Sequence, residues 1–134
     1  MAAVDADEVI EALGLAPHPE GGWYRETWRE PAVTAIYYLL RAGERSHWHR
    51  VDATEIWHFY DGDALELSLA AADGRTPPSR HVLAPDRPQQ VVPAGEWQAA
   101  RSLGRWSLVG CTVSPAFQIS GFELAPAGWE PGEV

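Results

Sequence analysis

Two histidines and a carboxylate lie close together in residues 43–62. His47 and His49 are two positions apart, and Glu55 follows six positions after the second histidine. Successive side chains of a strand alternate between its faces, so His47 and His49 should point the same way. If the chain turns after Arg50 and returns as a second strand, Glu55 joins them from that neighbouring strand. Two imidazoles and a carboxylate on adjacent strands indicate either a metal site or a proton-transfer site.

This segment resembles the first motif of the cupin superfamily, His-x-His, a short gap, a glutamate and a later glycine. Gly62 stands at the family's spacing from Glu55, while the gap between His49 and Glu55 is five residues, longer than usual in the family. Residues 93–98 resemble the second cupin motif, Pro-x-Gly-x-x-His. There Gln98 takes the position of the family's histidine.

The resemblance extends over most of residues 15–124. Residues 17–27, 91–104 and 108–113 look like the signature stretches of one subfamily of small, single-domain cupins. The resemblance implies a double-stranded β-helix, the cupin jelly-roll barrel. It also makes Glu20 and Tyr24, which lie in the first stretch, candidates for a place in the pocket.

The pattern of residues independently predicts an all-β chain with a short N-terminal helix. Asp5 is a suitable N-cap and Gly14 a suitable C-cap, so we expect the helix over residues 5–14. After it, apolar and aromatic runs separated by turn residues predict short strands without intervening helices, which is typical of an antiparallel sandwich or barrel. We therefore expect a single domain over residues 1–134, with the barrel at 15–124 and a surface tail at 125–134.

Composition limits the partners. The net charge is −9 and all ten basic residues are arginine, which disfavours nucleic acid and anionic membranes. No apolar run approaches the roughly 18 residues that a membrane span needs. The acidic first residues lack the basic start of a signal peptide, so we expect a cytoplasmic protein. The single cysteine, Cys111, lies in an apolar run and is predicted to be a buried thiol.

A metal-dependent site is one hypothesis for the motif. By the cupin resemblance, His47, His49 and Glu55 are the metal ligands, and Gln98 supplies a neutral fourth group. Two histidines and one carboxylate suit a divalent metal such as iron, manganese, nickel or zinc.

Metal-free acid–base chemistry is the other hypothesis. Some cupins that resemble deoxysugar-nucleotide epimerases use a histidine base and a tyrosine acid. By that resemblance His49 is the base, Glu55 orients it, and Tyr24, Tyr37 or Tyr38 is the acid. The predicted substrate-binding residues are His47, Trp57, Phe59, Gln98, Ser102 and Tyr24.

The sequence favours a small-molecule-binding cupin that works as an isomerase or epimerase on a carbohydrate-like or keto-acid metabolite. The alternatives are a metal-dependent, dioxygenase-like enzyme and a non-catalytic ligand-binding module. Lone histidines on strands are mostly structural, so His18, His58 and His81 are set aside. The apolar faces of residues 34–40 predict a homodimer.

Overall fold

The computed structural model describes residues 4–132, which form one short helix, eleven strands and a 3-10 turn. The helix is α1 (Ala6–Leu13), and the turn is η1 (Ile119–Gly121). The strands are β1 (Ala16–Pro17), β2 (Trp23–Glu30), β3 (Val33–Arg41), β4 (Arg45–Val51), β5 (Thr54–Gly62), β6 (Leu65–Ala70), β7 (Ser79–Leu83), β8 (Gln89–Val92), β9 (Trp97–Ser102), β10 (Trp106–Ser114) and β11 (Phe122–Leu124). Within residues 4–132 no helix is long and apolar enough to cross a lipid bilayer.

Helix α1 begins and ends where the sequence predicts. The Asp5 side chain accepts a hydrogen bond from the Glu8 main-chain N–H at 2.8 Å, and Gly14 closes the helix in the left-handed region at φ 67°. The apolar side of α1 packs against Leu39 and Trp106 on the outer face of a sheet. It therefore covers part of the apolar surface that residues 34–40 were expected to offer to a second subunit.

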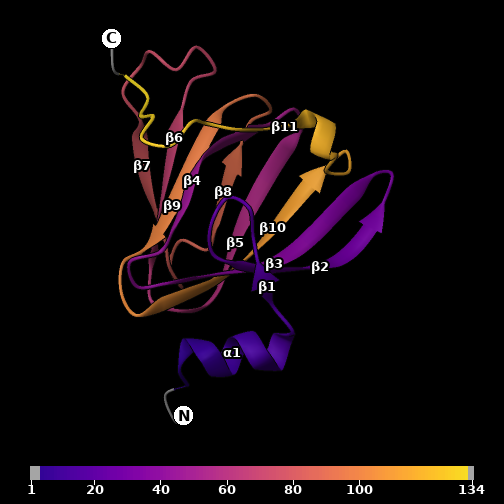
Figure 1. The fold of residues 1–134 in the computed structure, drawn as a ribbon, viewed down its shortest axis with the longest axis vertical. Coiled ribbons are helices and arrows are strands. Elements are labelled where there is room, and N and C mark those ends of the chain that lie inside the picture. Colours follow the sequence, from indigo (N-terminus) through magenta and orange to yellow (C-terminus); the bar gives the residue numbers. More distant parts are fainter. Residues whose placement is uncertain (1–3, 133–134) are drawn as a thin grey trace.

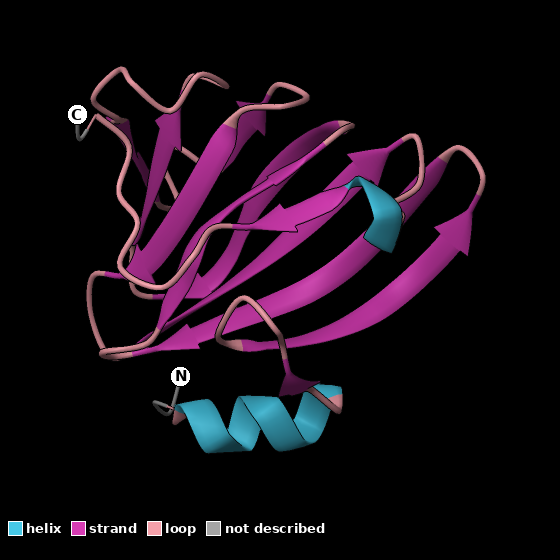
Figure 2. Ribbon diagram, turned by 45° about the horizontal axis from the view of Figure 1, so that its top comes forward, coloured by secondary structure: helices cyan, strands magenta, loops and turns pink. Residues whose placement is uncertain are grey.

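The strands form two antiparallel sheets that face each other, as predicted for a jelly roll (Figure 1). Sheet A has the order β1-β2-β3-β10-β5-β8, and sheet B the order β11-β4-β9-β6-β7. The late strands β10 and β9 lie in the interior of their sheets, between strands that come much earlier in the chain. Figure 2 shows β2 and β3 running together beyond the body of the barrel, with α1 beneath the sheet.

The main core lies between the two sheets. Strand β6 shows how the sequence builds it, because Leu65, Leu67 and Leu69 are buried on alternate positions as expected of a strand with one face inward. Trp57 and Tyr38 fill the same core from sheet A. Burial of these large side chains from both sheets stabilises the barrel.

The segment expected as a surface tail is packed over the outer face of sheet B. Trp129 contacts Trp48 and Trp97, and the Trp48 indole N–H donates to Glu130 at 2.9 Å. The Gly132 main-chain N–H donates to Gly74 at 2.9 Å. Residues 125–132 are thus part of the folded structure.

Candidate functional site

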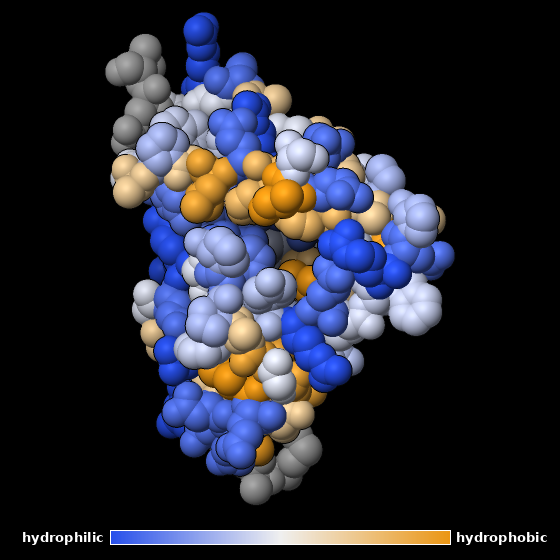
Figure 3. Space-filling model, turned by 45° about the vertical axis from the view of Figure 1, so that its right-hand side comes forward, coloured by the Kyte–Doolittle hydropathy of each residue, from blue (hydrophilic) through white to orange (hydrophobic). Residues whose placement is uncertain are grey.

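A cavity of about 230 Å³ opens between the two sheets and is the place where the chemistry-bearing residues meet. It has a polar inner part, formed by histidines and carboxyl groups, and an apolar outer part. Its lining residues are His18, Pro19, Glu20, Tyr24, Glu26, Arg29, Thr34, Ile36, His49, Val51, Glu55, Cys111, Val113, Phe117, Ile119 and Phe122. On the face drawn in Figure 3, hydrophobic residues gather in a band across the upper part and in a second patch below it.

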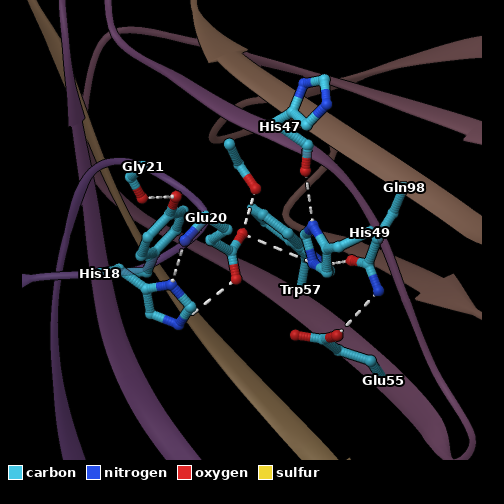
Figure 4. Close-up of polar contacts among 10 residues, drawn as sticks. His18, Glu20, Gly21, His47, His49, Glu55, Trp57 and Gln98 are labelled. Atoms are coloured by element: carbon cyan, nitrogen blue, oxygen red, sulfur yellow. Dashed lines mark hydrogen bonds and ion pairs between the residues drawn. The ribbon is translucent and has the colours of Figure 1, made fainter. Parts of the chain in front are cut away.

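His49 projects from β4 into the cavity and is fully buried (Figure 4). Its Nδ1 lies 2.8 Å from the main-chain carbonyl of His47. A carbonyl oxygen can only accept, so Nδ1 carries the proton, and the lone pair of Nε2 faces the cavity. Burial lowers the pKa of His49, which keeps the imidazole neutral near pH 7.

Glu20 lies beside His49 and comes from the loop between β1 and β2. Its Oε2 is 3.5 Å from His49 Nε2 and accepts a hydrogen bond from the Ser46 hydroxyl. On the other side, the Glu20 main-chain N–H donates to Nδ1 of His18 at 3.0 Å. Nε2 of His18 therefore carries the proton and faces Glu20 Oε1 at 3.3 Å. Three side chains thus fix the Glu20 carboxyl group at the bottom of the cavity.

Close main-chain packing holds the Glu20 loop in place. Gly21 has φ 109°, and a side chain there would collide with the main-chain carbonyl of Arg45. The Tyr38 hydroxyl donates to the carbonyl of Gly21 from the barrel core. Glycine is required at this position because both the backbone angle and the space exclude a larger residue.

Glu55 forms a second buried carboxyl group, held from the opposite side of the cavity (Figure 4). The Gln98 amide NH₂ donates to Glu55 Oε1 at 2.9 Å, and the Gln98 carbonyl oxygen accepts from the Trp57 indole N–H at 2.7 Å. An indole N–H is only a donor, so this contact fixes the orientation of the Gln98 amide. Trp57 and Gln98 thereby position Glu55.

The two carboxyl groups differ in acidity. Burial raises the pKa of Glu20 to about 8. Burial also raises the pKa of Glu55, and the nearby His49 limits the rise to about 6. Near pH 7 the cavity therefore holds the protonated carboxyl group of Glu20, the carboxylate of Glu55 and, between them, the neutral imidazole of His49. Burial lowers the pKa of His18 to about 4, so this ring is neutral as well.

The outer part of the cavity is apolar and carries one guanidinium group. Ile36, Val51, Val113 and Phe122 line it. Arg29 lies at the rim, where both oxygens of Glu26 accept from it at 2.8 Å. The Arg29 charge is therefore already neutralised by a bidentate ion pair.

The prediction that His47 and His49 share a face is wrong. The pairing of β4 with β9 shifts between Ser46 and His49, as at a β-bulge, so that Ser46 and His49 both point inward. His47 points away, and its Nε2 lies 3.0 Å from the Pro126 carbonyl under the C-terminal segment. His47 is therefore not placed to bind a ligand or a metal ion in the cavity.

The other predicted residues divide between the cavity and the barrel core. His49, Glu55 and Tyr24 line the cavity, and the Tyr24 ring stacks edge-on against His18 at 4.4 Å. Trp57 and Phe59 belong to the core behind it, and Gln98 acts through Glu55.

Ser102 lies apart from the cavity. Its hydroxyl bonds to that of Ser107 at 2.8 Å, and Ser107 in turn donates to the Asp63 carbonyl. The predicted role of Ser102 in substrate binding is not supported by this position.

His18 is the cavity residue that sequence reasoning set aside. A lone histidine gives no spacing signal, and its neighbour Glu20 was a candidate only through the resemblance of residues 17–27. The sequence signal that could have placed His18 and Glu20 together in the cavity is the pair of glycines after Glu20, both with φ above 70°. They mark a loop that approaches the main chain of β4 closely.

The predicted metal ligands do not assemble. His47 is turned away, and the Gln98 oxygen is occupied by the Trp57 N–H, which leaves His49 and Glu55. Among residues 4–132 no three or more histidine, cysteine, aspartate or glutamate side chains are grouped so that they could hold a metal ion.

Comparison with known proteins identifies the family. The family model described as Cupin superfamily (DUF985) matches residues 7–125. The chain belongs to this cupin family. The predicted all-β jelly roll is thus confirmed by both the family match and the two antiparallel sheets.

Two solved structures resemble this cupin along nearly its whole length. A crystal structure of a Shewanella oneidensis protein is 36% identical, with a TM-score of 0.85, and the match covers 92% of this chain and 85% of that one. A hypothetical protein from Leishmania major is 30% identical, with a TM-score of 0.83, covering 91% and 88%. No curated protein matches the chain.

A more distant likeness shows the fold alone. Bacillus subtilis oxalate decarboxylase is 12% identical to this cupin, with a TM-score of 0.66, and the match covers 81% of this chain and 29% of that one.

Proposed function

We propose that this cupin is an acid–base enzyme that moves a proton within a small uncharged metabolite, as in isomerisation or epimerisation. One observation carries the proposal. Two buried carboxyl groups line the same cavity, and their pKa values lie on either side of neutrality, at about 8 for Glu20 and about 6 for Glu55. Such a divergence is how one site supplies an acid and a base at the same pH.

Glu55 has the properties of the base. Above pH 6 it is a carboxylate that accepts side-chain hydrogen bonds from the Gln98 amide, at Oε1, and from the Cys111 thiol. A pKa near the working pH favours proton removal from carbon next to a carbonyl group. The sequence assigned the base to His49 and its orientation to Glu55. We now give Glu55 the base role, because the His47 carbonyl already orients His49.

Glu20 is the acid, and the neutral His49 imidazole lies beside it. Glu20 is protonated below pH 8, and its Oε2 lies 3.5 Å from the free lone pair of His49. Glu20 donates its proton to the substrate carbonyl oxygen while Glu55 takes one from carbon. Glu55 then returns a proton to the neighbouring carbon or to the other face of the same carbon, and Glu20 takes back a hydroxyl proton of the enol. The carbonyl group is thereby re-formed, which completes isomerisation or epimerisation.

The charges around the cavity favour an uncharged substrate. The inner part holds two carboxyl groups and two neutral imidazoles, and the rim guanidinium of Arg29 is paired with Glu26. A keto acid would bring a carboxylate to this acidic interior without a free cation to meet it. Of the two predicted substrate classes, the cavity therefore suits carbohydrate-like or other neutral carbonyl compounds with an apolar portion.

Solvent deuterium exchange tests the proposal. A panel of neutral sugars and cyclic ketones, with 2-oxo acids for comparison, would first be screened for binding by thermal shift. Bound compounds would then be incubated with the protein in D₂O and followed by proton NMR. We expect deuterium at carbon next to the carbonyl group, and loss of this exchange in Glu55→Gln.

Two further variants make the result specific. Glu20→Gln should slow exchange, while Glu123→Gln, at an exposed carboxylate on β11, should leave it unchanged. Saturable binding with no exchange by any bound compound would contradict the enzyme proposal and support the ligand-binding module. A cytoplasmic location and the absence of nucleic-acid partners stay predictions from the sequence.

A further inference from the structure

Strand β2 has an open edge along most of its length. It pairs with β3 on one side, while β1 covers the other side only at Trp23 and Tyr24. Residues 25–30 are all exposed, and Trp28 is 59% exposed. In the described part of the chain no strand pairs with this edge, which lies at the outer limit of the sheet in Figure 2. An unpaired edge of this length is a template for another strand.

A bulge decides which side chains of β2 share a face. The register between β2 and β3 shifts between Glu26 and Trp28, so Thr27 is an extra residue. As a result Glu26 and Arg29 both line the cavity, although residues three apart in a regular strand lie on opposite faces. Arg25 and Glu30 lie opposite outward-facing residues of β3 and share the outer face.

The charges of this edge complement those of an antiparallel copy of itself. We propose that a second copy of this chain pairs along β2, with Glu26 opposite Arg29 of the partner subunit and Arg25 opposite Glu30 of the partner subunit. A two-fold axis perpendicular to the sheet keeps each residue on its own face, so residues paired across it must share a face. The bulge at Thr27 satisfies this condition for both pairs.

Neighbouring registers are unfavourable. A shift by one residue in either direction would place Arg25 opposite Arg29 of the partner subunit or Glu26 opposite Glu30 of the partner subunit. Each of these pairs combines the outer face with the cavity face, which the two-fold axis does not allow. Like charges directly opposite each other destabilise a sheet, and opposite charges stabilise it. Charged residues on an edge strand usually discourage pairing with other strands. Here their alternating signs disfavour other strands and favour β2 of a second copy.

Pairing of two β2 strands would bring charged groups of both subunits to the rim of the cavity, whatever reaction the cavity supports. Glu26 and Arg29 are 37% and 45% exposed and already form an ion pair within one chain. In the dimer the same two groups from each subunit form a cluster of four alternating charges at the rim. The partner would thus contribute to the cavity entrance whether or not the site is an enzyme.

Sedimentation velocity with charge-reversed variants tests the interface. We expect the full chain to be a dimer whose dissociation constant rises about tenfold or more in Arg25→Glu and in Glu30→Arg, because each change sets like charges together twice. The double variant Arg25→Glu/Glu30→Arg restores opposite charges in both pairs and should return to within a few fold of the parent. Arg80→Glu, on the exposed strand β7 of sheet B, is the matched control and should not change the dimer.

Four results would overturn the proposal. They are a monomeric parent protein, single variants that dimerise as well as the parent, a double variant as weak as either single variant, and an equal loss in the Arg80→Glu control. Circular dichroism of each variant checks that the fold is retained.

Discussion

Replacing Glu20 by glutamine should remove a pH dependence of stability. Burial raises the pKa of Glu20 from 4.5 to about 8, so the folded protein keeps a proton there that the unfolded chain has released. Stability from this group therefore falls as the pH rises from 4.5 to 8. The reverse holds for His18, whose pKa falls from 6.5 to about 4, so that its contribution makes stability rise with pH and is complete by pH 6.5.

The interval above pH 6.5 isolates Glu20. The increase in stability that comes from His49, whose pKa is lowered from 6.5, is complete by pH 6.5. The decrease in stability that comes from Glu55, whose pKa is about 6, is also largely complete by that pH. Between pH 6.5 and 8 the Glu20 contribution spans roughly 1.5 pH units, which corresponds to a loss of about 2 kcal/mol in the free energy of unfolding.

Urea unfolding followed by tryptophan fluorescence measures this loss. The parent protein should be about 2 kcal/mol less stable at pH 8 than at pH 6.5, while Glu20→Gln should show almost no change. Glu123→Gln, at an exposed carboxylate, should keep the parent's slope. A parent protein whose stability is flat or rises over this interval, or a Glu20→Gln variant that keeps the fall, would refute the reasoning.

Three further predictions concern the residues that build the cavity. Gly21→Ala should lower the free energy of unfolding by about 3 kcal/mol or more, because it adds a main-chain collision to a positive φ. Gly43→Ala, with φ 81° and open space around it, should lower it by about 1 kcal/mol. Equal losses of the two variants in urea unfolding would contradict this. Gln98→Ala should lower the free energy of unfolding by about 2–4 kcal/mol, since it removes the amide donor from the buried Glu55 and leaves the Trp57 indole N–H buried without a partner. A loss under about 1 kcal/mol would count against the buried network. Cys111 is buried with a raised pKa, so a thiol-reactive dye should label it only after unfolding, and rapid labelling of the native protein would speak against its burial.

Local sequence signals predicted most of the fold. The caps of α1 depend on Asp5 and Gly14 themselves, and the alternation of β6 follows from its own leucines. The position of residues 125–132 could not be predicted in this way. Their packing depends on Trp48 and Trp97, which are distant in sequence, and the composition of a surface turn looks the same with or without such contacts.

The site was predicted in part, and the errors have a physical origin. Glu55 and His49 reach the cavity as expected. The strand alternation that placed His47 beside His49 fails at one bulge, which no residue type in this segment signals. Glu20 and His18 enter from a loop, and their approach depends on close packing of Gly21 against β4 rather than on any periodic pattern.

The order of strands in the two sheets has a consequence for biosynthesis. In sheet A, β10 separates β3 from β5, and in sheet B, β9 separates β4 from β6. While the chain is still being synthesised, β2 can already pair with β3, but β3, β4, β5 and β6 each lack one neighbouring strand until residues 97–114 emerge. Such distant pairing makes folding slow and late, so the nascent barrel depends on being kept from premature association until its last third has left the ribosome.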